Sequence, residues 1–148
     1  MRIYIDVCSL SRPFDDLTQD KIYLEAEAVL SIVSRCETDD WTLIGSGIIE
    51  YELSNISDEE KFEQVQSIYS VTNERIALTM QAEERAKHFQ KNGIKPLDSL
   101  HLALAEAYNV DVFLTTDNHF LDKANQLNVK IKTANPVTWL MEVINDES

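Results

Sequence analysis

Short apolar runs alternate with longer amphipathic stretches along the whole chain, and this alternation restricts the possible folds more than any other feature. The apolar runs predict strands near Arg2–Asp6, Trp41–Gly45, Arg75–Leu78, Val112–Thr115 and Val129–Lys132. The amphipathic stretches predict helices near Lys21–Cys36, Gly47–Ile56, Glu59–Val71, Thr79–Asn92, Leu97–Tyr108, His119–Leu127 and Pro136–Ile144. Strands that alternate with helices form βαβ units, so we expect an α/β fold with a mostly parallel central sheet flanked by helices.

Length and composition indicate one globular domain over residues 1–148. Hydrophobic residues make up 44% of the chain, and no repeat or Gly/Ser-rich linker divides it. No apolar stretch approaches bilayer length and no signal-peptide pattern is present, so we expect a cytoplasmic protein with no membrane partner. Cys8 and Cys36 lack metal-ligand or redox spacing, and reduced thiols fit that location.

Three aspartates occupy positions that are informative about chemistry. Asp6 ends the apolar run MRIYID, Asp117 ends VFLTTD, and Asp98 opens the helix in PLDSLHLALAEAY. Open parallel sheets bind ligands beyond the carboxyl ends of their strands, where Asp6 and Asp117 fall. Carboxylates that converge at such an edge hold divalent metal ions, so we expect the three side chains to meet there.

Each aspartate also has a purely structural interpretation. Asp117 could cap the helix that follows it, Asp98 could be a favourable charge at a helix N-terminus, and Asp6 could form a turn out of its strand. Three structural acids at these particular positions are the less economical account, and a shared site is the preferred one.

Glu52 and Glu50 compete for a fourth place in the site. At 100° per residue, Glu52 falls inside the apolar arc of its helix, whereas Glu50 lies on the other side. An acid inside an apolar arc needs a partner or a metal ion. Glu52 is therefore the predicted site residue, and Glu50 is predicted to be a surface acid.

At this point the chain resembles PIN-domain nucleases. The strings IYIDVCSL and SGIIEYEL look like the first two motifs of that family, and PLDSLHLALAEAYNVDVFLTTDNHF resembles the third and fourth. The resemblance spans residues 1–132 and keeps the order of all four acids. It implies a PIN-like three-layer fold with Asp6, Glu52, Asp98 and Asp117 as metal-site and catalytic acids. It also implies supporting polar roles for Ser9, Thr115 and Asn118.

The resemblance further implies an Mg²⁺- or Mn²⁺-dependent endoribonuclease, often the toxin of a bacterial toxin–antitoxin pair. RNA would be the substrate and a small antitoxin protein a partner, while pairing with a second copy of the chain stays open. Many relatives carry a further acid two residues after the last Asp, and here that position is His119. This departure bears on a second metal site, and the number of metals stays open.

Two other interpretations remain beside the nuclease. One is a non-catalytic PIN-like binding module with a vestigial acid site. The other is a phospho-acceptor receiver domain, which is disfavoured because only one acid follows the first strand. The net charge of −13 argues against general duplex binding, although bound cations would reverse the local field at a site.

Overall fold

The computed structural model describes residues 1–147, and in that range five strands form one sheet. The strands are β1 (Arg2–Ile5), β2 (Thr42–Ser46), β3 (Glu74–Ile76), β4 (Val112–Leu114) and β5 (Lys132–Ala134). Their order is β3-β2-β1-β4-β5, and every neighbouring pair is parallel. The predicted α/β class is confirmed. The order also differs from the 2-1-3-4-5 order of receiver domains, which excludes that interpretation.

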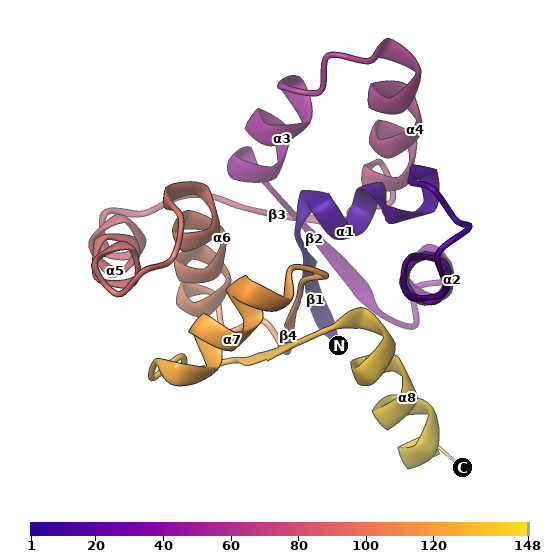
Figure 1. Cartoon of the computed structure of the whole chain (residues 1–148). Helices are drawn as coiled ribbons and strands as arrows, with labels where there is room; N and C mark the ends of the chain where they lie inside the picture. The colour runs from indigo at the N-terminus through magenta and orange to yellow at the C-terminus, as the bar shows by residue number, and fades with distance from the viewer. Residues whose placement is uncertain (148) are drawn as a thin grey trace.

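Helices cover both faces of the sheet and extend beyond its carboxyl edge. They are α1 (Val7–Ser11), the 3₁₀ helix η1 (Arg12–Phe14), α2 (Asp20–Glu37), α3 (Gly47–Ser54), α4 (Glu59–Tyr69), α5 (Met80–Lys91), α6 (Pro96–Ala107), α7 (Asn118–Gln126) and α8 (Pro136–Glu147). Figure 1 shows α5, α6 and α7 on one side of the sheet, α2 and α8 on the other, and α3 and α4 beyond α1. Within the described residues no helix is long and apolar enough to cross a membrane.

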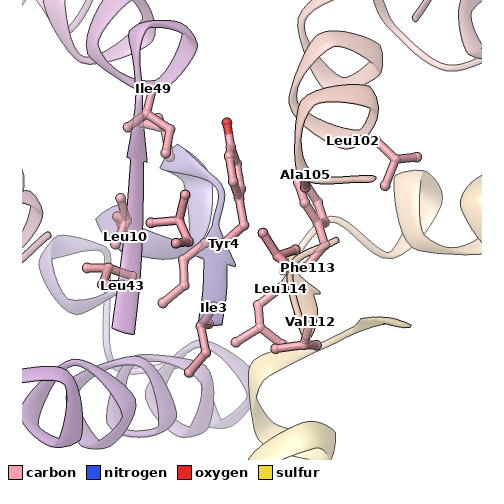
Figure 2. Packing of buried hydrophobic residues seen from close by; sticks show 14 of the residues in the cluster. Ile3, Tyr4, Leu10, Leu43, Ile49, Leu102, Ala105, Val112, Phe113 and Leu114 are labelled. Carbon is pink, nitrogen blue, oxygen red and sulfur yellow. The ribbon is translucent and has the colours of Figure 1, made fainter. Parts of the chain in front are cut away.

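The hydrophobic core lies between the sheet and the helices that cover its two faces. Figure 2 shows Ile3 and Tyr4 of β1 packed beside Leu43 of β2 and Phe113 of β4. The rings of Tyr4 and Phe113 stack with centroids 5.3 Å apart. Both faces of β1 and β4 are buried, which explains why these strands are continuous apolar runs in the sequence.

Two predicted strands are shifted in the structure, and side chains explain both shifts. Pairing of β3 stops at Ile76, and the next carbonyl, of Ala77, accepts a hydrogen bond from the Tyr108 hydroxyl at 2.9 Å. Strand β5 begins at Lys132 rather than Val129, because the backbone N–H of Lys130 donates to the Glu106 carboxylate at 2.9 Å. At Lys130, a side-chain carboxylate thus accepts the backbone hydrogen bond that a neighbouring strand would otherwise accept.

The connections place three chain segments at one edge. Strands β1 and β4 are adjacent, with Ile5 opposite Leu114, so the residues that follow them are neighbours. Helix α6 leads into the amino end of β4, and its own first turn therefore lies at the carboxyl edge. Gly93, with φ of 99°, and Pro96 at the first helical position make the sharp turn that separates α5 from α6.

Candidate active site

Four acidic residues lie beyond the carboxyl ends of the central strands. Asp6 follows β1 directly, Asp117 follows β4 after two threonines, Asp98 lies in the first turn of α6, and Glu52 lies on α3. The charges of Asp6, Asp117 and Glu52 all act on Asp98, so the four share one electrostatic neighbourhood. The four acids that the sequence analysis selected therefore lie at one edge of the sheet, and their role as a shared site stays a prediction.

Asp98 shows the effect of this neighbourhood most clearly. Burial is the largest cause that raises its pKa, from an ordinary 3.8 to about 6. The charges of Asp6, Asp117 and Glu52 raise the pKa further, and His101 acts in the opposite direction. Like charges that are held together disfavour ionisation, so the site favours the arrival of either a proton or a cation.

Asp6 is buried, with 4% of its surface exposed. Its Oδ1 atom accepts hydrogen bonds from the backbone N–H and the hydroxyl of Ser9, at 3.1 and 2.7 Å, and from the Cys8 thiol at 3.2 Å. Burial is the main cause that raises the pKa of Asp6, and the Ser9 hydrogen bond opposes it. The Ser9 oxygen also accepts from the N–H of Thr116 at 3.0 Å, which fastens α1 to the loop after β4.

Asp117 caps α7 with the side chain that faces the site. Its Oδ1 accepts from the N–H of Phe120 at 3.1 Å, and its own N–H donates to the Thr115 hydroxyl at 3.1 Å. Ser9 and Thr115 therefore contact the acids as supporting groups would. Asn118 is exposed, and within residues 1–147 it makes no hydrogen bond to any of the four acids.

The two glutamates of α3 have different partners. Glu50 is bound by Arg75, with both nitrogen–oxygen distances at 2.9 Å, and by the Tyr69 hydroxyl at 2.7 Å. The Arg75 hydrogen bond is the main cause that lowers the pKa of Glu50. Glu52 instead contacts Nε2 of His101, the residue one turn after Asp98 on α6. Glu50 is thus engaged by a basic residue, and Glu52 remains the predicted site residue.

His101, Tyr4 and Ser46 form a buried polar group under Glu52 that sequence reasoning did not assemble. The Tyr4 hydroxyl lies 2.6 Å from Nδ1 of His101 and 2.9 Å from the Ser46 hydroxyl. His101 lies one helical turn after Asp98 on the same helix. Tyr4 lies in an apolar strand and Ser46 ends another, so neither carried a sequence signal for this polar group.

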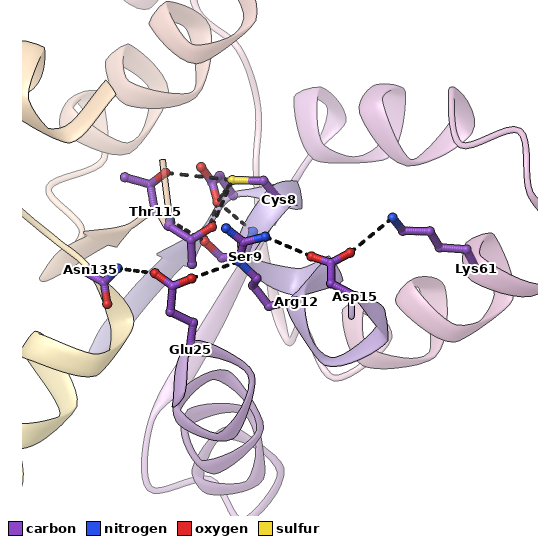
Figure 3. Close-up of polar contacts among 10 residues, drawn as sticks. Cys8, Ser9, Arg12, Asp15, Glu25, Lys61, Thr115 and Asn135 are labelled. Carbon is purple, nitrogen blue, oxygen red and sulfur yellow. Dashed lines mark hydrogen bonds and ion pairs between the residues drawn. The ribbon is translucent and has the colours of Figure 1, made fainter. Parts of the chain in front are cut away.

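Arg12 belongs to a second polar network beside the site (Figure 3). It donates to Asp15 and to the buried Glu25, both at 3.0 Å, and Glu25 also accepts from the Asn135 amide at 2.7 Å. Lys61 approaches Asp15 at 3.5 Å. Arg12 is therefore an ion-pair partner that joins η1 to α2 and to the start of α8.

A small hollow of about 60 Å³ opens next to the acids. Its lining includes the acids Asp98 and Asp117 together with Lys95, Lys123 and His119. His119, the departure from the family pattern, thus lies beside two of the four acids. Basic groups at this position give a locally mixed charge in a chain that is acidic as a whole.

The chemistry of the four acids fits a hard divalent cation, because Mg²⁺ and Mn²⁺ prefer carboxylate oxygens. Among residues 1–147, however, no three His, Cys, Asp or Glu side chains are grouped closely enough to form a finished metal site. Three of the acids make local hydrogen bonds: Glu52 contacts His101 through one oxygen, while Asp6 and Asp117 each cap a helix. The four acids match a hard divalent cation in the type of ligand atom, which is a carboxylate oxygen.

These observations define a class of protein. It is an α/β domain with an all-parallel sheet and with acids at the carboxyl edge of its central strands. A protein-family model described as PIN domain matches residues 3–126, and the chain therefore belongs to the PIN domain family. The predicted PIN-like resemblance and fold are confirmed.

Solved structures agree with this assignment at the level of the fold. One is a crystal structure of VapBC2 from Rickettsia felis bound to a DNA fragment of its promoter. It matches with a TM-score of 0.58 and 14% sequence identity, and the match covers 91% of this chain and 98% of that chain. VapBC-1 from nontypeable Haemophilus influenzae matches with a TM-score of 0.56 and 14% identity, covering 92% and 98%. No curated protein sequence matches the chain.

Proposed function

We propose that this chain is an Mg²⁺- or Mn²⁺-dependent endoribonuclease. The observation that supports the proposal is that a PIN-domain fold carries Asp6, Glu52, Asp98 and Asp117 beyond the carboxyl ends of its central strands, where the other three charges act on Asp98. Asp6, Glu52, Asp98 and Asp117 would hold the cation. When bound, a divalent cation activates water and stabilises the charge that develops in phosphodiester hydrolysis.

The protein's own residues would prepare this site in three ways. Ser9 and Thr115 hold the backbone on either side of the acids, so the carboxylates start from fixed positions. Asp98 gives up its proton readily near neutral pH, since its pKa is about 6, and the acid is then charged when a cation arrives. Lys95 and Lys123 flank the hollow, where they would attract the phosphate backbone of RNA.

The experiment that tests this function is RNA cleavage by the purified protein. Single-stranded RNA should be cut internally in the presence of Mn²⁺, and EDTA should stop the reaction. Asp98→Asn should be inactive because a neutral amide is a poor metal ligand, and Glu50→Gln is the matched control. Wild-type protein that leaves RNA intact with Mn²⁺ would refute the proposal.

A non-catalytic binding module is the second candidate. The observation in its favour is that no three potential ligands are grouped as a finished metal site among the described residues. Such a module would bind RNA or a partner equally well with Mn²⁺ and with EDTA, and the acid variants would bind as the wild type does. The cleavage assay separates the two candidates.

We also propose that the chain acts in the cytoplasm as the toxin of a toxin–antitoxin pair. Two solved structures that share its fold are of VapBC proteins. A partner should present a basic residue to the acids, and Arg fits best because its planar fork matches carboxylates bidentately. Co-purification from the native cell tests this: a small partner should accompany the chain, and its loss should make expression of the active form harmful.

A further inference from the structure

We propose that Tyr4 and Ser46 are positioning residues for Glu52, acting through His101. A buried chain of hydrogen bonds, Ser46–Tyr4–His101–Glu52, would select one tautomer of the imidazole and aim the Glu52 carboxylate at the acid site. This inference rests on the proposed function, since it treats Glu52 as a cation ligand.

The contacts are continuous from the sheet to the site. The Ser46 hydroxyl lies 2.9 Å from the Tyr4 hydroxyl, which in turn lies 2.6 Å from Nδ1 of His101. The opposite ring nitrogen, Nε2, contacts Oε1 of Glu52. The other oxygen, Oε2, accepts no hydrogen bond from residues 1–147 and can therefore serve as a ligand.

The directions of these hydrogen bonds follow from the groups available. Ser46 Oγ accepts the N–H of Ile49 at 3.2 Å, so its own proton is free to go to the Tyr4 oxygen. Tyr4 then donates its single proton to Nδ1 of His101. Nε2 must carry the remaining imidazole proton, and it donates that proton to the Glu52 carboxylate.

If every hydrogen bond ran in the opposite direction, one proton would lack an acceptor. If Nδ1 of His101 donated to Tyr4, Tyr4 would donate to Ser46, and the Ser46 proton would have no acceptor among the contacts of the described residues. The contact between His101 and Glu52 would then also need an additional proton. The forward assignment gives every donor of the hydrogen-bond chain an acceptor, so it is the assignment that the contacts favour.

Packing keeps the middle of the hydrogen-bond chain in place. Tyr4 and His101 are both fully buried, and their rings meet edge to face with centroids 5.6 Å apart. The other face of Tyr4 stacks on Phe113. Figure 2 shows the Tyr4 hydroxyl pointing away from Ile3 and toward the level of Ile49 in α3. Neither ring can turn without disturbing the core.

Ser46 positions Glu52 by a second route as well. Its hydroxyl is the N-cap of α3, the helix that carries Glu52, through the same hydrogen bond from Ile49. One hydroxyl thus sets both the start of the helix and the first link to the imidazole. Glu52 is held from its backbone and from its side chain.

The test measures Mn²⁺ affinity by calorimetry on the full chain. His101→Gln should weaken binding by roughly 10- to 100-fold, as loss of an outer partner of a metal ligand does. Tyr4→Phe removes one oxygen and should weaken binding in the same direction. Tyr108→Phe is the matched control, because the Tyr108 hydroxyl donates to the Ala77 carbonyl and takes no part in the hydrogen bonds that lead to Glu52. In a Glu52→Gln background, Tyr4→Phe should have no further effect.

A second readout needs no metal. Nitrogen NMR of the metal-free protein should show His101 as the Nε2–H tautomer, and Tyr4→Phe should disturb that signature. A wild type that binds Mn²⁺ while Tyr4→Phe matches Tyr108→Phe would overturn the positioning role alone. An Nδ1–H tautomer would overturn it as well. A wild type that binds no Mn²⁺ would refute the metal-dependent function and this role together.

Discussion

Asp6 and Asp117 each cap a short helix with the carboxylate that faces the site. At the residue scale, structural and functional roles therefore share the same side chains. The alternative interpretation of Asp117 as a cap is correct, and Asp6, for which a turn was the alternative, also caps a helix. Capping uses Oδ1 in both cases, and it fixes where each carboxylate points. A cap that orients a second oxygen is compatible with metal binding.

The two glutamates of α3 provide the sharpest prediction for single residues. Glu52→Gln should lose most Mn²⁺-dependent RNA cleavage, whereas Glu50→Gln should keep most of it, because Glu50 is bound by Arg75 and Tyr69 instead. Raising the Mn²⁺ concentration should restore part of the Glu52→Gln activity. A dead Glu50→Gln variant beside an active Glu52→Gln variant would reverse the assignment.

Asp98 predicts a pH-dependent change in stability. Its folded-state pKa of about 6 lies above the ordinary 3.8, so folding favours the protonated acid. Its contribution to stability is therefore full at low pH and is lost as the pH rises from about 4 through 6. At pH 7 without metal, Asp98→Asn should stabilise the fold by about 1–2 kcal/mol, after allowance for partial exposure.

Urea unfolding in EDTA checks this at two pH values. The gain from Asp98→Asn should be clear at pH 7 and small near pH 4, where Asp98 is protonated in the folded state and roughly half protonated in the unfolded state. Equal effects at both pH values would mean that the charge of Asp98 is not what the fold opposes.

At the scale of elements, the periodicity of the sequence predicted the larger helices and the parallel sheet. Side-chain contacts determine the strand ends and the short helix that periodicity did not predict. Helix α6 follows from the apolar spacing after Pro96, and β1 and β4 follow from uninterrupted apolar runs. Helix α1 was missed because five residues give too little periodicity, and its start depends on the Asp6 cap. Likewise, the link between Tyr4 and His101 joins residues 97 positions apart, which no local pattern can reveal.

The Arg12 network should act as a structural clamp between elements. Arg12→Met leaves Glu25 buried, with only 1% of its side chain exposed, and without its cation. Loss of one partner from a buried pair typically costs about 3–5 kcal/mol, and the remaining Asn135 hydrogen bond should place this variant near the lower end. Urea unfolding measures the loss, and adding Glu25→Gln should recover part of it. Lost cleavage with unchanged stability would instead make Arg12 a substrate-binding residue.

At the scale of the whole molecule, the excess of negative charge and the acid site act together. The chain carries a net charge of −13, so a divalent cation should stabilise the folded state where carboxylates are concentrated. Mn²⁺ at 100 times its dissociation constant should add roughly 2.7 kcal/mol to the stability of the fold. Thermal unfolding should show a rising Tm across a millimolar Mn²⁺ titration, and EDTA should reverse it. Asp6→Asn should respond much less.

The most direct test of the account is a crystal of the protein soaked in Mn²⁺ and measured at the manganese absorption edge. The account predicts anomalous density in contact with carboxylate oxygens of Asp6, Asp98 and Asp117 and with Oε2 of Glu52, while Oε1 stays on His101. The same peak should disappear in Asp98→Asn crystals. Density elsewhere, or none at this edge of the sheet, would contradict the claim that these four acids form a metal site.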